Sequence, residues 1–143
     1  MSAIAQLYLV PRDLLVAEQL PVHVVATKFG RRIDPDAFPY SGYLMLDVLT
    51  FLGERDIPID STELPYRTDP DGPYDTVITT EHRALLPQLD PAGYPLGEIR
   101  EFMDQYDELD DDELQGAFTD TLNLLRTTIA DLADDEALVV LIW

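Results

Sequence analysis

The chain has 143 residues, which is enough for one domain of ordinary size and too few for two domains with separate cores. Hydrophobic residues make up 46% of it and charged residues 26%, proportions that argue against disorder, collagen-like repeats and coiled coils. Because 28 acidic residues stand against nine basic ones, the net charge is -19, which argues against direct binding to nucleic acid or anionic lipid. With zero cysteines, disulfides, thiolate nucleophiles and cysteine-ligated metals are excluded.

The start of the sequence does not have the pattern of a secretory signal, because it lacks a basic region and reaches Pro11 after a short apolar stretch. The longest nearly apolar run, residues 43–52, is about half the length that a bilayer span requires. We therefore expect a cytoplasmic protein without a membrane-spanning segment.

Short elements alternate in the first part of the chain. Residues 3–10 alternate imperfectly between apolar and polar side chains and end at Pro11, which predicts a strand. Residues 12–20 carry leucines at helical spacing and predict a short helix. The β-branched residues of 22–27 predict a second strand, and 30–39, which has no periodicity, predicts a surface loop.

The middle of the chain predicts one buried helix and one long connection. Ser41 is a suitable N-cap for a helix that is apolar around most of its circumference and ends at Gly53. Residues 54–75 hold four prolines and an Asp-Gly step, which predict a long irregular segment. A short strand at 76–79 and a helical turn at 81–86 follow.

The last part of the chain has the clearest periodicity. Apolar residues at steps of three and four predict a helix from about 95 to 109 and a second, longer one over 114–132. Asp110 and Glu113 have the spacing of a capping box for the second helix. The apolar run 137–143 predicts a central strand. We expect one α+β domain spanning 1–143, in which a small sheet containing the N- and C-terminal strands packs against three or more helices.

Three segments of the sequence resemble a known family in their order and spacing. They are the opening strand and helix at 3–20, the middle helix at 42–53, and the last helix running into the strand at 138–142. In this respect the chain is similar to the YfbM-like bacterial proteins, a family without an assigned activity. The resemblance implies an α+β fold and identifies no functional residues.

Seven carboxylates stand within ten positions of the second half, and no basic residue lies among them. A run of acids before a helix partly complements the positive end of the helix dipole, and the rest of it reads either as solvated surface or as a docking patch for a basic protein. The calcium pattern of an EF-hand is absent. Our leading interpretation is a non-enzymatic binding protein, similar in manner to an inhibitor or immunity protein. The run consists of Asp104, Asp107, Glu108, Asp110, Asp111, Asp112 and Glu113.

Two other interpretations stay open. Tyr40, Tyr43 and Asp47 share one side of the middle helix, which makes them either a solvent-facing polar stripe or the lining of a pocket in a small-molecule-binding or hydrolytic enzyme. Alternatively, the acidity is a host-wide adaptation without functional meaning, since 19 of the 28 acids are Asp and one of the nine bases is Lys.

Two minor features of the sequence are candidate sites for an ion or a phosphate. The turn at 69–75 offers carboxylates around a glycine, and a plain β-turn is favoured there over an ion site. The basic cluster of Lys28, Arg31 and Arg32 could hold a phosphate, although pairing with acids of the same chain is favoured. No phosphate-binding loop or dinucleotide fingerprint exists, so no cofactor is expected.

The two histidines stand in no catalytic motif. His23 alternates with apolar neighbours and is expected on the exposed face of the strand predicted at 22–27. His82 stands near a predicted helix start, where a capping or surface role is expected.

The net charge alone generates a prediction about stability. Like charges on a domain of this size repel one another and oppose compaction until salt screens them. We expect the Tm to rise between low ionic strength and about half molar sodium chloride, a range over which the screening length shrinks several-fold. Thermal unfolding followed by circular dichroism checks this, and a Tm that stays flat or drops contradicts it.

Overall fold

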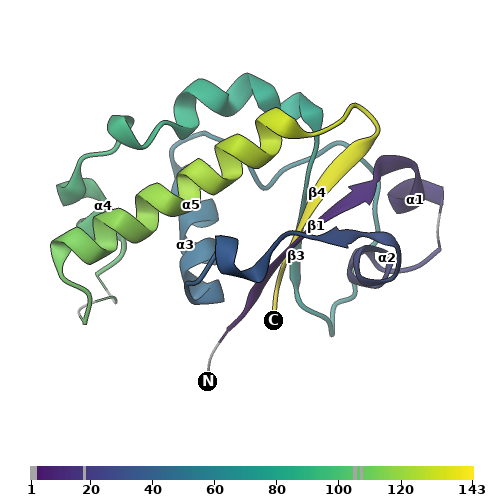
Figure 1. The fold of residues 1–143 in the computed structure, drawn as a ribbon, viewed down its shortest axis with the longest axis horizontal. Helices are drawn as coiled ribbons and strands as arrows, with labels where there is room; N and C mark the ends of the chain where they lie inside the picture. Colours follow the sequence, from purple (N-terminus) through teal and green to yellow (C-terminus); the bar gives the residue numbers. More distant parts are fainter. Residues whose placement is uncertain (1–2, 18, 105, 107) are drawn as a thin grey trace.

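The computed structural model describes residues 3–17, 19–104, 106 and 108–143, and its centre is a four-stranded antiparallel sheet (Figure 1). The strands are β1 (Ala5–Pro11), β2 (Arg31–Arg32), β3 (Tyr74–Ile78) and β4 (Glu136–Ile142), in the order β2-β1-β4-β3. Helices pack around the sheet, and the predicted α+β class is confirmed.

The two ends of the chain pair with each other at the centre of the sheet. The register of β1 and β4 runs from Ala5 opposite Ile142 to Pro11 opposite Glu136. The pairing continues to Trp143, whose backbone N–H donates to the carbonyl oxygen of Ile4 at 3.0 Å. Each residue from 137 to 141 is fully buried, because helices cover both faces of β4. The prediction that the terminal strands share a sheet, with the last one central, is confirmed.

One face of the sheet is covered by α3 (Gly42–Glu54) and α5 (Asp111–Asp131), which carry the larger part of the core. Both helices begin as the sequence predicts: the Ser41 hydroxyl accepts from a backbone N–H of α3, and Asp110 and Glu113 form the capping box of α5. Aromatic rings of the two helices meet edge to face, with the centroids of Phe51 and Phe118 5.3 Å apart. This core also holds the short helix α4 (Leu96–Phe102) in place through Ile99.

The other face is covered by α1 (Arg12–Ala17) and α2 (Val22–Phe29), seen together at one end of Figure 1. The strand predicted at 22–27 is therefore wrong. Its β-branched residues favoured a strand locally, but Val22, Val25 and Ala26 stand at helical spacing and bury together against the sheet. Tertiary burial outweighs the local propensity here.

The helix predicted from 95 to 109 is also wrong in length, because α4 ends at Phe102. Arg100 explains the early end: its guanidinium donates to the carbonyl oxygens of Tyr106 and Leu109 at 3.1 and 2.9 Å, which holds the following segment in a turn. The apolar periodicity persists because Met103 is buried, and Tyr106 and Leu109 are half-buried, against the same core.

The connections contain short 3-10 helices. The segment predicted as irregular at 54–75 is irregular over 55–73, since α3 extends to Glu54 and β3 begins two residues before the strand predicted at 76–79. Among the described residues, no helix combines the length and hydrophobicity needed to cross a membrane. The 3-10 helices are η1 (Pro35–Ala37), η2 (Thr80–Leu89), which covers the predicted helical turn at 81–86, and η3 (Pro91–Gly93).

Two glycines of α3 allow a matched test of how closely the helix approaches the backbone just before β1. A Cβ at Gly42 would lie 2.9 Å from backbone atoms of Ile4, whereas one at Gly53 would meet only a side-chain oxygen of Asp60 at 4.0 Å. We expect Gly42→Ala to destabilise the fold by about 1–3 kcal/mol through overpacking. The control Gly53→Ala is expected to be neutral or stabilising by up to about 1 kcal/mol, because alanine favours a helix.

Urea unfolding of the two variants measures the difference in the free energy of unfolding. Equal effects of the two substitutions would contradict the close approach of α3 to the backbone of Ile4.

Candidate functional site

The acidic run occupies the turn between α4 and α5 and the first turn of α5. Six of its members are described by the structure, and all six are exposed; the seventh, Asp107, lies outside the described residues. Three of them have structural roles. Asp110 and Glu113 cap α5, and Asp111 accepts two hydrogen bonds from the guanidinium of Arg100, at 3.2 and 2.9 Å. The structure thus accounts for part of the run in the way that helix capping predicts.

The other three members are neither side-chain caps nor ion-pair partners. Asp104, Glu108 and Asp112 are exposed and form no hydrogen bond or ion pair with any other described residue. Asp112, in the first turn of α5, still complements the positive end of the helix dipole. Carboxylates placed close together repel one another, and no basic residue of the described chain pairs with these three. Their negative charge faces the solvent and is available to a partner.

A groove of about 500 Å³ lies between the end of α3 and α4, the helix that leads into this turn. Its base is aromatic, with the rings of Phe51 and Phe102 5.2 Å apart and edge to face. Carboxylates stand on its rim, and one cation, Arg55, lies within it. The sequence did not reveal this groove, because its two walls are far apart along the chain. The lining residues are Phe51, Glu54, Arg55, Glu98, Glu101 and Phe102.

The residues predicted to line a pocket on the middle helix are engaged in different ways. Tyr40 donates a short hydrogen bond to Asp120 of α5, and this bond, together with burial, raises the pKa of Tyr40 to about 12. Asp47 is half-buried and accepts from the hydroxyl of Tyr106 at 2.7 Å. Burial and this hydrogen bond raise the pKa of Tyr106. Tyr43 is exposed.

These contacts tie the segment just before α3 to α5, and α3 to the turn that precedes α5. They give Tyr40 and Asp47 structural partners, and no substrate-binding geometry follows from them. The hydrolytic or small-molecule pocket at Tyr40, Tyr43 and Asp47 stays a prediction.

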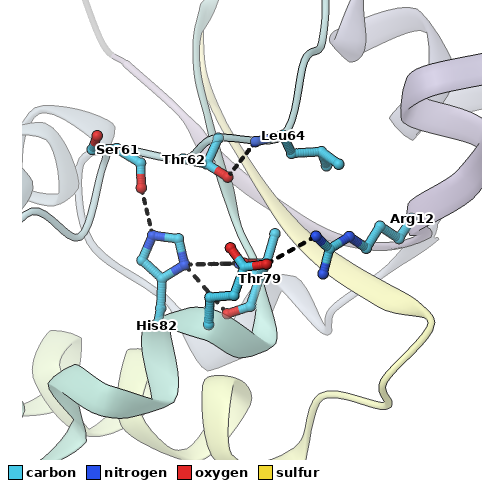
Figure 2. Close-up of polar contacts among 7 residues, drawn as sticks. Arg12, Ser61, Thr62, Leu64, Thr79 and His82 are labelled. Carbon is cyan, nitrogen blue, oxygen red and sulfur yellow. Dashed lines mark hydrogen bonds and ion pairs between the residues drawn. The ribbon is translucent and has the colours of Figure 1, made fainter.

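His82 has the capping role that its position predicts, but it is buried and not on the surface. Its Nδ1 accepts from the backbone N–H of Thr79 at 3.0 Å, so the ring proton is on Nε2, which donates to the carbonyl oxygen of Ser61 at 2.7 Å. Figure 2 shows the ring held between these two segments, with Arg12 paired to Glu81 nearby at 3.0 Å.

A general base or metal ligand needs a free lone pair on a ring nitrogen. Both ring nitrogens of His82 are used by the backbone, so this histidine fastens the segment around Ser61 to the start of η2. The shallow pocket beside it, of about 280 Å³, therefore contains no histidine available for catalysis.

His23 is not on the exposed face of a strand, because its segment is helical and its ring is half-buried. The ring packs edge to face on Trp143, with centroids 5.7 Å apart, and the turn at Gly72 lies directly against it. Its Nδ1 and the Oδ2 of Asp75 are buried and lack hydrogen-bond partners among the described residues. Burial raises the pKa of Asp75, and hydrogen bonds from Thr68 and Tyr66 partly oppose the rise.

The turn at 69–75 has the hydrogen bonds of a β-turn. The backbone N–H of Asp71 donates to the Oδ1 of Asp69 at 2.9 Å, and that of Gly72 donates to the Asp69 carbonyl oxygen at 3.0 Å. In residues 3–17, 19–104, 106 and 108–143, no three His, Cys, Asp or Glu side chains are placed to hold a metal ion.

The expected pairing of the basic cluster with acids is wrong. Lys28, Arg31 and Arg32 are exposed, and none of them forms an ion pair with a described carboxylate. Lys28 lies over the ring of Phe29 instead, with its Nζ 5.3 Å from the centroid. The cluster lies at the end of α2 and on the edge strand β2, away from the acidic turn (Figure 1).

No family model, curated protein or solved structure matches this chain. The resemblance to the YfbM-like proteins therefore stays a prediction.

The raised pKa of Asp75 generates a pH-dependent prediction. A carboxyl that holds its proton more tightly when folded stabilises the fold fully below its unfolded pKa of about 3.8. This contribution is lost as the pH rises through the folded value. Asp75→Asn removes the buried charge and can still accept from Thr68. We expect the variant to be more stable than the wild type at pH 7, with a difference that shrinks as the pH falls towards 4.

Urea unfolding between pH 4 and pH 8 measures this difference. Asp71→Asn is the control, since it removes an exposed carboxylate from the same turn and should show no such pH dependence. An Asp75→Asn variant that is no more stable than the wild type at pH 7 contradicts the prediction.

Proposed function

We propose that the protein is a non-enzymatic binding protein that engages a basic protein through the acidic surface around the α4–α5 turn. The proposal rests on three exposed carboxylates that pair with no basic residue of the described chain. They are Asp104, Glu108 and Asp112. Residues that neither cap a helix nor pair with an arginine contribute little to the fold and are suited to contact another molecule.

The charge pattern supports a basic partner of protein size. A surface dense in one sign of charge raises the rate of encounter with a partner of the opposite sign and rejects partners of the same sign. The net charge of -19 adds a long-range field of the same sign. An inhibitor or immunity protein works in this manner when its target has a basic surface.

The histidines support a role without catalysis. His82 has both ring nitrogens bonded to the backbone, and the Nδ1 of His23 is buried beneath neighbouring residues. A general acid or base has to reach the substrate within hydrogen-bond distance, and these two nitrogens of His82 and the Nδ1 of His23 do not offer that access.

Host adaptation makes a different prediction about the same charges. Under that interpretation the acids only keep the protein hydrated, and neutralising three of them in one place has the same consequence as neutralising three elsewhere. Comparison of two matched variants therefore distinguishes the interpretations.

The turn variant combines Asp104→Asn, Glu108→Gln and Asp112→Asn, and retains Asp110, Asp111 and Glu113 for the fold. The control combines Glu63→Gln, Asp131→Asn and Asp135→Asn, exposed acids that lie away from the turn. We expect affinity capture from the producing cells, read by mass spectrometry, to recover a basic protein with the wild type and the control and to lose it with the turn variant.

The purified pair then gives the rate constants. Loss of the three charges in the turn variant is expected to slow association with the partner by about tenfold at low salt and to change the dissociation rate little. Recovery of the same proteins by all three forms would sink the proposal and leave the acids as solvated surface.

A further inference from the structure

The groove between α3 and α4 already contains a guanidinium. Arg55, the C-cap residue just after α3, folds its side chain back so that its Cζ lies 4.5 Å from the ring centroid of Phe51 and 5.9 Å from that of Tyr94. Its Nη2 pairs with the Oε2 of Glu98 at 2.9 Å. A planar cation on an aromatic face, with a carboxylate at its edge, is the arrangement in which an arginine side chain is bound.

The groove offers more negative charge than this one arginine neutralises. Glu54 and Glu101 also line it, both are exposed, and neither forms an ion pair with a described residue. Three carboxylates thus surround one cation. The second aromatic ring, Phe102, packs against Phe51 and extends the apolar base of the groove.

The hold on Arg55 is weak. The side chains of Arg55 and Glu98 are 38% and 45% exposed, and ion pairs with this much exposure are easily exchanged. A competing guanidinium would find the same ring and the same carboxylate, together with the charge that Arg55 leaves uncompensated. Because the groove lies on the segment that runs into the acidic turn, one partner can reach both.

We propose that this groove is a binding site for an arginine side chain of the partner, and that Arg55 occupies it in the free protein. The inference rests on the proposed function, since it names the chemistry by which a basic partner is anchored. A lysine fits less well, because an ammonium group neither stacks on a ring as a plane nor pairs with a carboxylate through two parallel hydrogen bonds.

The test uses the peptide acetyl-Gly-Arg-Gly-amide, titrated into ¹⁵N-labelled protein and followed by NMR. Amide signals of residues 51–55 and 98–102 are expected to shift. The lysine peptide is expected to bind several-fold more weakly, and the citrulline peptide, which has the same shape without the charge, is expected not to bind.

The decisive variant is Arg55→Gln. When a competing side chain occupies a site, the apparent affinity is reduced by the fraction of time that the site is empty, so removing the competitor raises it. We expect the arginine peptide to bind on the order of tenfold more tightly. Arg55→Lys keeps the charge but loses the planar stacking, and is expected to give a smaller increase.

Arg12→Gln is the matched control. It makes the same change in charge and breaks an ion pair of similar length, Arg12 to Glu81 at 3.0 Å. Arg12 is the first residue of α1, which lies at the opposite end of the molecule from α4 (Figure 1). If both Gln variants bind the peptide more tightly by the same factor, net charge is the cause and the arginine site is wrong. Equal or weaker binding by Arg55→Gln, or equal binding of the arginine and lysine peptides, also overturns it.

The experiments can contradict either of the two proposals without contradicting the other. If the turn variant loses the partner but Arg55→Gln does not strengthen peptide binding, the acidic docking surface stands and the arginine site falls. If the turn variant keeps every captured protein while the peptide still distinguishes Arg55→Gln from Arg12→Gln, the groove binds arginine and the proposed docking surface is wrong.

Discussion

The pairing of β1 with β4 is the constraint on which the rest of the fold depends. It joins the two ends of the chain along seven residue pairs, and so almost the whole chain is closed into a loop when it forms. Loop-closure entropy rises only slowly with length, but pairing so remote in sequence slows folding. Alternate side chains of β4 point to opposite faces of the sheet and so belong to two separate cores. Leu138 and Val140 face α3 and α5, whereas Val139 and Leu141 face α2.

The sequence was sufficient wherever local pattern and tertiary burial agree. The long helix after Asp110 has both a capping box and five turns of apolar periodicity, and the terminal strand is apolar throughout because both its faces are covered. The prediction failed at 22–27, where β-branched residues favour a strand and burial against the sheet requires a helix. It failed again after Phe102, where the guanidinium of Arg100 donates to the carbonyl oxygens of Tyr106 and Leu109 and holds the segment in a turn.

The candidate site, like the fold, could be predicted from the sequence only in part. The density of acids is visible in the sequence, and their partial use as caps follows from helix physics. Which carboxylates remain without a role could not be predicted, because it depends on where Arg100 points, and Arg100 stands eleven residues from its partner Asp111. The groove could not be predicted at all, because Arg55 and Glu98 belong to elements that are far apart in the sequence and meet only in the fold.

The use of the scarce cations explains why one end of the molecule presents negative charge. Among the described residues, five arginines form ion pairs, and all of these pairs except Arg100 to Asp111 join segments far apart in the sequence. At the acidic end, Arg100 turns inward to backbone carbonyls and Arg55 folds onto Phe51, so neither directs its charge fully outward. Two of the unpaired cations, Arg31 and Arg32, lie on the edge strand β2, where like charges discourage pairing between two copies of that edge. The basic residues thus join segments of the fold or protect the edge strand β2. The carboxylates around the α4–α5 turn therefore dominate the electrostatic field that an approaching molecule meets there.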